Sequence, residues 1–189
     1  MIAKGLDFPN VNLVGVINAD TALHLPDFRA AEKTFQLVTQ VAGRTGRGSE
    51  EGRVIVQTYC PDHPAILAAS QHDYQRFATE ELKLRRQFRY PPQCHSARMV
   101  IRGESEVKTA AFAESMRERL LQLQSPDDLR MLGPAPAPVA KLRTLYRYHL
   151  LVFADDGDVL RQRLRQLQES IKTPADLQWI IEIDPVNLL

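Results

Sequence analysis

Cysteine is scarce in this sequence. The 189 residues include only Cys60 and Cys94, and no CxxC motif is present. A disulfide-rich secreted scaffold is therefore excluded, two thiols fit a reducing compartment, and no metal site is expected in this chain. A chain of this length buries roughly 70% of the surface that its unfolded form exposes, so it needs neither a disulfide nor a metal to fold.

An excess of charge of one sign and long apolar runs are also missing. Lysine and arginine total 24 against 23 aspartate and glutamate residues, which gives a net charge of +1. A nucleic-acid role must then rest on local basic patches. No apolar run approaches the ~20 residues of a membrane span. The opening residues MIAKGLDFPN resemble neither a signal peptide nor a transit peptide. We therefore expect no membrane contact and a cytoplasmic location.

The first third of the chain has the pattern of a strand, a helix and a second strand. Residues 11–17 and 53–59 are rich in apolar and β-branched side chains. Between them, residues 30–41 repeat apolar side chains at helical spacing. Strand, helix and strand with short links predict a βαβ unit whose strands are parallel.

The remainder of the chain predicts a helical stretch and then a second domain. Residues 64–88 form one or two helices, which Tyr90-Pro91-Pro92 ends. The elements that follow are a strand at 96–102, a helix at 105–123, a short proline-rich edge strand near Gly133, a strand at 145–153, a helix with Asp156 as its N-cap that runs to Ile171, and a strand at 177–183. In the strand at 96–102, Ala97, Met99 and Ile101 face inward and Arg98, Val100 and Arg102 face outward. In the last strand, Trp179 shares one face with Leu177 and Ile181. Their β-α-β-β-α-β order is that of a ferredoxin-like split βαβ fold. We thus divide the chain into a partial α/β lobe (1–61), a helical connector (62–92) and a small α+β C-terminal domain (93–189).

The segment Gln40-Val41-Ala42-Gly43-Arg44-Thr45-Gly46-Arg47-Gly48 is the most informative one. Two arginines three residues apart leave a predicted helix end, and glycines beside them let the backbone approach a ligand closely. Guanidinium forks suit phosphate oxygens, so this turn can clamp a triphosphate. The alternative is a glycine-rich helix cap with two solvated arginines, and the local pattern alone leaves both readings open.

Longer strings resemble a known family. Residues 40–47, QVAGRTGR, resemble motif VI of superfamily 2 helicases, and Ala3-Lys4-Gly5-Leu6-Asp7 resembles the end of motif V. The strings MIAKGLDFPNVNLVGVINAD, PDFRAAEKTFQLVTQVAGRTGR, GRVIVQTYCPDHPAI, RYHLLV and IEIDPVNLL resemble the primosomal replication-restart DNA helicases of bacteria. The resemblance covers essentially the whole chain and implies that residues 1–61 are part of a RecA-like second helicase lobe.

The resemblance also implies roles for individual residues. Arg44 and Arg47 would contact the ATP phosphates, with Arg47 the γ-phosphate finger. Gln40 would couple the nucleotide to the lobe interface, Gly5 and Asp7 would lie beside the nucleotide, and Lys4 would face ATP or the DNA backbone. ATP with magnesium would bind the full-length protein, and the family's zinc-binding cysteines lie upstream. The phosphate loop belongs to the other lobe, and no Gly-Lys-Ser/Thr tripeptide occurs here. We therefore expect an upstream lobe in the parent protein and no ATPase activity from this chain alone.

Two basic clusters are candidates for DNA contact. The first precedes Tyr90 and includes Lys83 and Arg86; a solvated helix end is its alternative. The second interleaves basic and aromatic side chains, which suits phosphates and base stacking. Its members are Lys141, Arg143, Arg147 and Tyr148, and its alternative is an exposed strand with tyrosines that face the core.

Three functional hypotheses follow. The first is the C-terminal part of a replication-restart helicase, whose partners by resemblance are branched and single-stranded DNA, single-stranded DNA-binding protein and other primosome proteins. The second is a stand-alone DNA- or protein-binding module without ATPase activity. The third is a non-functional fragment, in which an incomplete sheet leaves apolar surface exposed.

Overall fold

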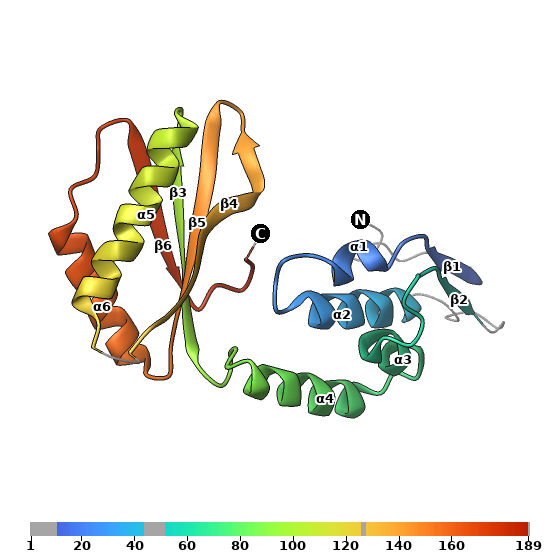
Figure 1. Cartoon of the computed structure of the whole chain (residues 1–189). Helices are drawn as coiled ribbons and strands as arrows, with labels where there is room; N and C mark the ends of the chain where they lie inside the picture. Colours follow the sequence, from blue (N-terminus) through green and yellow to red (C-terminus); the bar gives the residue numbers. More distant parts are fainter. Residues whose placement is uncertain (1–10, 44–51, 126–127, 189) are drawn as a thin grey trace. The chain divides into compact units, whose positions relative to one another are not determined.

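The fold is taken from a computed structural model, which describes residues 11–43, 52–125 and 128–188 (Figure 1). The chain forms two compact units, residues 1–84 and residues 85–189. The division falls inside helix α4 (Tyr74–Gln87), so the first part of the predicted connector 62–92 packs with the first unit. We describe each unit by itself.

The first unit contains the predicted βαβ arrangement. Strands β1 (Leu13–Val16) and β2 (Arg53–Val56) pair in parallel, with Leu13 opposite Arg53. Parallel strands need a crossover connection, and helix α2 (Ala30–Ala42) lies between them in the chain. A short helix α1 (Asp20–Leu23) precedes α2, in the link between residues 17 and 30 for which the sequence predicted no helix. Helix α2 ends at Ala42, and Gly43 closes it by donating its backbone N–H to the Thr39 carbonyl at 3.1 Å.

The core of the first unit joins α2 to the helices that follow β2. The predicted helical stretch is two helices, α3 (Pro64–Ser70) and α4, separated by His72 at a φ of 53°. The aromatic rings of Phe35 in α2 and Phe77 in α4 stack with centroids 4.5 Å apart. Buried alanines of α3 let it pack closely on α2. This packing holds the α2 end that leads into the arginine segment 44–48.

The second unit has the predicted β-α-β-β-α-β order. Its elements are β3 (His95–Gly103), α5 (Glu106–Leu123), β4 (Arg130–Leu142), β5 (Leu145–Ala154), α6 (Gly157–Ser170) and β6 (Leu177–Ile183). The four strands form one antiparallel sheet in the order β4-β5-β3-β6. Strand β5 thus lies between β3 and β4, which α5 connects, so the βαβ unit is split by an inserted strand. This unit is an α+β domain.

Both helices of the second unit cover the same face of the sheet (Figure 1). Ala97, Met99 and Ile101 of β3 alternate along the strand and are fully buried against the helices. Met116 and Leu120 come from α5, and α6 contributes its leucines to the same cluster. The alternation of β3 was predicted, and its inward residues are as expected. The other face of the sheet carries no helix within the described residues.

Side-chain caps fix where the two helices begin. The Ser105 hydroxyl accepts a hydrogen bond from the Lys108 backbone N–H at 3.4 Å. The Asp156 carboxylate accepts from the backbone N–H groups of Asp158 at 2.7 Å and Val159 at 3.3 Å. Each cap satisfies donors that have no partner inside the helix, so each fixes a boundary. The cap at Asp156 was predicted from the sequence.

Strand β4 is longer than the sequence predicted. It spans Arg130–Leu142, 13 residues, with Pro134, Pro136 and Pro138 inside it. It is an edge strand, where alternate N–H groups point away from the sheet, so prolines at every second position need not break the ladder. The pairing with β5 shifts register between Leu132 and Ala135 and between Pro136 and Lys141. The strand was expected at the edge but short, because proline alone indicated an interruption.

The single tryptophan lies where the alternation of β6 placed it. Trp179 is partly buried and packs against the helix-covered core. Its indole Nε1–H donates to the Thr173 hydroxyl at 2.8 Å. An indole that is fixed in the second unit makes tryptophan fluorescence a reporter of that unit alone.

Candidate nucleic-acid interface

Most of the predicted nucleotide residues lie outside the described residues. These are Lys4, Gly5, Asp7, Arg44 and Arg47. Gln40 is exposed on the last turn of α2. The described part of the site is therefore its scaffold: two parallel strands and the helix that delivers the chain to the arginine segment.

The face of the C-terminal sheet that the helices leave uncovered is strongly basic. Arg98 and Arg102 lie on this face of β3, Arg98 at only 8% exposure and Arg102 exposed, and Arg147 lies on β5. Antiparallel register places Arg102 directly opposite Arg147. Like charges directly opposite each other destabilise a sheet. A charge pair of this kind favours an anionic ligand above the two strands.

The arginines on this face differ in their partners. Arg98 is held by Glu182 of β6, with both its Nε and a terminal nitrogen bonded to one carboxylate oxygen, at 2.8 and 2.6 Å. The Arg102 Nε donates to the Gln178 amide oxygen at 3.0 Å, a neutral partner. Within the described part of the chain, no acidic side chain pairs with Arg147. Positive charge thus remains uncompensated at Arg102 and Arg147.

A histidine in the middle of the face is affected by this charge. His149 lies opposite Val100 in the register of β5 and β3. Burial lowers the pKa of the His149 imidazole, and the positive charges of Arg98 and Arg147 lower it further. The neutral imidazole is therefore favoured near pH 7, and the arginines carry the charge of this face.

The floor of the face is apolar and shallowly hollowed. A cavity of about 220 Å³ lies over the strands. Its lining consists of basic side chains and aliphatic ones together: Arg98, Val100, Arg102, Leu142, Leu145, Arg147, Ile180 and Glu182. Aliphatic carbon beside guanidinium groups can accept sugar and base surface next to phosphates. This surface, defined by Arg98, Arg102, Arg147 and His149, is called the open face below.

The second predicted basic cluster is divided by strand geometry. Successive side chains of a strand point to opposite faces. Arg147 lies on the open face, whereas Tyr148 packs against the helix-covered core. Lys141 is close to Tyr146, with its Nζ 4.4 Å from the ring centroid and 3.2 Å from the hydroxyl oxygen. Arg143 is at the β4–β5 turn with a φ of 58°. Only Arg147 of the four candidates joins the arginines of β3.

The first predicted basic cluster lies along helix α4. Lys83 pairs with Glu80 at 2.7 Å on an exposed helical turn, and Arg86 is exposed in the last turn. Exposed pairs of this kind contribute little to stability. Basic residues at this end complement the helix dipole, so the position alone does not distinguish a DNA contact from a solvated helix end.

Comparison with known proteins shows where these residues belong. A model of the family described as "Primosomal protein N C-terminal domain" matches residues 86–186. Replication restart protein PriA of Bacillus subtilis is 43% identical over the whole chain, and the PriA proteins of Treponema pallidum and Haemophilus influenzae are 41% and 37% identical. The chain belongs to the PriA family.

The match covers a small part of each relative. The chain spans 24% of the Bacillus subtilis protein, 29% of the Treponema pallidum protein and 26% of the Haemophilus influenzae protein. The resemblance recognised in the sequence is thereby confirmed. Among solved structures, the de novo designed protein Foldit4 covers 50% of this chain with a TM-score of 0.39 and 11% identity, a likeness too weak for any inference. Within the described residues, no helix is long and apolar enough to cross a membrane.

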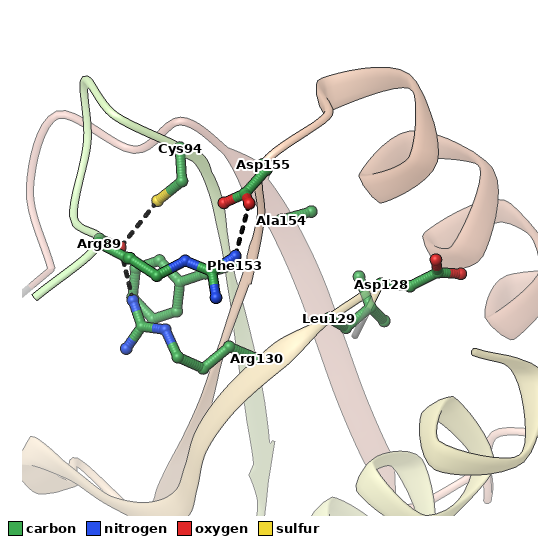
Figure 2. Close-up of a pocket in the computed structure, with 8 residues that line it drawn as sticks. All are labelled: Arg89, Cys94, Asp128, Leu129, Arg130, Phe153, Ala154 and Asp155. Carbon is green, nitrogen blue, oxygen red and sulfur yellow. Dashed lines mark hydrogen bonds and ion pairs between the residues drawn. The ribbon is translucent and has the colours of Figure 1, made fainter. Parts of the chain in front are cut away.

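A second cavity of the PriA C-terminal domain, of about 270 Å³, is an alternative candidate for a ligand site (Figure 2). The Arg130 guanidinium lies over the rings of Phe153, at 4.3 Å, and Tyr90, at 5.2 Å, and donates to the Arg89 carbonyl at 2.7 Å. Arg89 pairs with Asp155. These contacts fasten the segment after α4 to the sheet.

The acidic and thiol groups of this second cavity are also engaged. Asp128 pairs with Arg163 at 2.7 Å. The Cys94 thiol donates to the Arg89 carbonyl at 3.0 Å, and burial raises the pKa of that thiol, which keeps it neutral. Arg89 and Asp128 are in ion pairs and Arg130 is held by two aromatic rings and a backbone carbonyl, so these side chains serve packing within the second unit and the open face is the better candidate for a ligand.

Sequence reasoning missed part of the open face. It identified Arg98 and Arg102 only as outward residues of a strand, and it assigned no role to His149. The available signal was two arginines four residues apart on the polar side of a strand. Pairing them with Arg147 required the register of β3 with β5, which a single strand does not reveal.

Proposed function

We propose that this chain is the C-terminal part of an ATP-dependent DNA helicase that restarts stalled replication forks. In this role it supplies arginine fingers to ATP and a DNA contact on the C-terminal domain. The observation that carries the proposal is the match of the whole chain to relatives named replication restart protein PriA, combined with the opposed Arg102 and Arg147 on the open face.

The nucleotide half of the proposal rests on the βαβ scaffold and on the sequence QVAGRTGR. Parallel β1 and β2 with α2 between them suit a RecA-like lobe, and α2 leads directly to Arg44 and Arg47. Planar guanidinium forks fit phosphate oxygens, so the two arginines suit the charge of a triphosphate. An arginine finger on the γ-phosphate contributes about 10³–10⁵ in rate.

Other nucleotide contacts complete this half-site. Gln40 couples the nucleotide to the lobe interface, Gly5 and Asp7 lie beside the nucleotide, and Lys4 faces ATP or the DNA backbone. Magnesium accompanies ATP in the full-length protein, where it neutralises the developing phosphate charge. Zinc belongs to the upstream region of the full-length protein. The partner lobe supplies the phosphate loop, so this chain alone has no ATPase activity.

The DNA half of the proposal rests on the open face. Phosphates neutralise the opposed arginines, so binding relieves a repulsion that the free domain carries. The aliphatic floor and the small hollow accept the sugar and base edges of single-stranded or branched DNA. Lys141 and Arg143 at the β4–β5 hairpin, and Lys83 and Arg86 on α4, add further phosphate contacts. Single-stranded DNA-binding protein and the other primosome proteins are the protein partners, in the cytoplasm.

A second candidate function is a DNA- or protein-binding module without any link to ATP. The observation in its favour is that residues 85–189 form a compact unit with a core of their own. ATPase reconstitution separates the two. Under the helicase proposal, the PriA family's upstream lobe hydrolyses ATP when it is joined to this chain and loses activity with Arg47→Ala. Under the module proposal, that substitution changes nothing. Hydrolysis by the pure chain alone contradicts the prediction that half an active site is inert.

Fluorescence anisotropy tests the DNA contact. A fluorescein-labelled forked DNA is titrated with the full chain at several salt concentrations, because phosphate contacts make affinity fall with salt. Arg147→Ala should weaken binding and flatten the salt dependence, while Arg117→Ala, on the helix-covered side at α5, should leave both unchanged. Equal affinity for Arg147→Ala and the parent chain would remove the open face as the site.

A further inference from the structure

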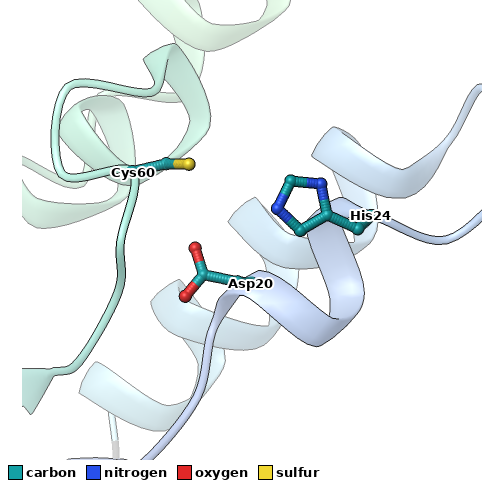
Figure 3. A group of neighbouring side chains, drawn as sticks. All are labelled: Asp20, His24 and Cys60. Atoms are coloured by element: carbon teal, nitrogen blue, oxygen red, sulfur yellow. The ribbon is translucent and has the colours of Figure 1, made fainter.

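Three side chains of the first unit that the proposed function does not use converge on one point (Figure 3). Asp20 and His24 are four residues apart, at the start of α1 and directly after it, so both project from the same side of one helical turn. Cys60 comes from the segment after β2. One carboxylate oxygen, one imidazole nitrogen and the thiol sulfur lie within 4.8 Å of one another.

Hydrogen bonds hold the Asp20 side chain and the Cys60 backbone in place. The Thr58 hydroxyl donates to Asp20 Oδ1 at 2.7 Å and accepts from the Cys60 backbone N–H at 3.0 Å. The Tyr59 backbone N–H donates to Asp20 Oδ2 at 3.0 Å. These bonds orient the carboxylate and the backbone of Cys60 from outside the cluster, as the supporting bonds of metal ligands do.

The ligand types select one class of metal. A thiolate, an imidazole and a carboxylate together suit Zn²⁺, whereas Ca²⁺ and Mg²⁺ take oxygen ligands only. The hydrogen bonds from the Thr58 hydroxyl and the Tyr59 backbone N–H do not exhaust the carboxylate, since each Asp20 oxygen accepts one hydrogen bond and keeps a second lone pair.

The geometry needs only a small adjustment. Zinc bonds of about 2.0–2.3 Å place tetrahedral ligand atoms roughly 3.5 Å apart, about 1 Å closer than the 4.8 Å limit of this cluster. His24 is exposed, so its ring can turn toward the other two ligands. Three protein ligands leave a fourth position for water.

We propose that Asp20, His24 and Cys60 form a Zn²⁺ site that fastens α1 to the segment following β2. The expectation of no metal site in this chain rested on local motifs, whereas the pairing of β1 with β2 brings Cys60 to His24 and Asp20, which precede it by 36 and 40 residues. The site shares no residue with the proposed ATP and DNA contacts, so an experiment can test it separately from the proposed function.

Cobalt replaces zinc in such sites and reports a thiolate ligand through a charge-transfer absorption band. Tag-free full chain is titrated with Co²⁺, and Zn²⁺ is then added in competition. We expect one Co²⁺ per chain, a thiolate band, and loss of that band when Zn²⁺ displaces the cobalt. The chain has only two cysteines, so substitution assigns the band: Cys60→Ser should abolish it and Cys94→Ser should leave it intact.

A second variant removes the histidine without disturbing the bonds to Asp20. His24→Ala should weaken Zn²⁺ affinity at least about tenfold, because losing even an outer partner of a ligand costs 10–100-fold. Circular dichroism checks that both variants keep the fold. No cobalt band in the parent chain, a band that survives Cys60→Ser, or unchanged Zn²⁺ affinity in His24→Ala would each overturn the proposal.

Discussion

Arg102 and Arg147 lie directly opposite each other on neighbouring antiparallel strands, on the face of the C-terminal sheet that no helix of the described chain covers. Two like charges in this position cost the sheet free energy, and the described residues provide only a neutral amide for Arg102. The two opposed charges therefore destabilise the free domain and at the same time attract an anion. Two opposite consequences of one substitution follow from this.

The first prediction is that Arg147→Gln strengthens the fold and weakens DNA binding. Removing one of two opposed charges should raise the free energy of unfolding of the second unit by about 0.2–1 kcal/mol. It should also lower affinity for forked DNA and reduce the slope of log affinity against log salt by about 0.7–0.9, the value of one phosphate contact. Urea unfolding followed by Trp179 fluorescence gives the first quantity, and anisotropy gives the second.

Arg117→Gln is the matched control. Arg117 pairs with Glu114 on an exposed turn of α5, away from the open face. Its loss should cost a few tenths of a kcal/mol at most and leave DNA binding unchanged. If Arg147→Gln lowers stability or keeps the parent salt slope, the opposed charges do not serve DNA.

The second prediction concerns pH and His149. Burial and the neighbouring Arg98 and Arg147 lower the pKa of this imidazole below its ordinary 6.5, so the unfolded chain takes up its proton at a higher pH than the folded domain. The contribution of His149 to the free energy of unfolding is therefore fully present above pH 6.5. It is lost as the pH falls from 6.5 through the lowered pKa of the folded domain. Thermal unfolding between pH 7.5 and 5, followed by Trp179 fluorescence, should show a declining Tm.

His149→Gln should flatten that decline, because the substituted amide has no proton to gain. The comparison is made as a difference between the two chains, which cancels His95 and every other group that they share. Aspartates of the same unit have pKa values lowered from 3.8 and so titrate below this window. A parallel decline in both chains would assign the pH dependence to other groups.

The third prediction concerns close packing at the end of β3. A Cβ added to Gly103 would lie 2.3 Å from a Leu177 methyl and 2.8 Å from the Thr109 hydroxyl oxygen. Gly103→Ala should therefore destabilise the second unit by about 1–3 kcal/mol. The measurement is again urea unfolding by tryptophan fluorescence.

Gly15 is a control at the same residue type in the first unit. A Cβ there meets nothing within 4 Å. Gly15→Ala should leave the Trp179 transition unchanged and leave the far-ultraviolet circular dichroism of the chain intact, or raise stability slightly by restricting the unfolded chain. A Gly103→Ala chain as stable as the parent would show that Leu177 can move aside without cost.

The sequence predicted the order of elements well because apolar periodicity and breakers are local. The strands at 96–102, 145–153 and 177–183 and the helix from Asp156 were expected near the positions that the structure gives. The length of strand β4 was underestimated because its three prolines indicate an interruption when they are considered locally. Only the position of β4 at the edge of the sheet allows a strand to contain them. Helix α1 was missed because four residues are too few to show a period.

The candidate sites depend on pairing, and pairing is not local. Neighbours in sequence such as Arg147 and Tyr148 were grouped, and the strand places them on opposite faces. Arg102 and Arg147 are far apart in sequence and adjacent in space. The same holds for His24 and Cys60. The predicted roles of Arg44 and Arg47 come from a resemblance and stay predictions, since both lie outside the described residues.

The fourth prediction tests the helix cap at Asp156. Its carboxylate accepts hydrogen bonds from two backbone N–H groups of the first turn of α6, at 2.7 and 3.3 Å. Asp156→Ala leaves those donors without a protein partner and removes a negative charge from the positive end of the helix dipole. We expect a loss of about 1 kcal/mol in unfolding free energy by urea titration.

A substitution at Asp158 distinguishes the effect of the cap hydrogen bonds from the effect of a negative charge near the helix dipole. Asp158 lies two residues further on, in the same first turn, and pairs with Arg161 on an exposed surface at 2.7 Å. Asp158→Ala removes the same charge near the same dipole but no bond to a backbone donor, so its cost should be only a few tenths of a kcal/mol. Equal losses for the two variants would mean that the dipole, not the cap, fixes where α6 begins. A larger loss of unfolding free energy for Asp156→Ala means that the backbone N–H groups at the start of α6 need this one carboxylate. Asp156 lies between β5 and α6, and α6 completes the core on the side of the sheet opposite the open face.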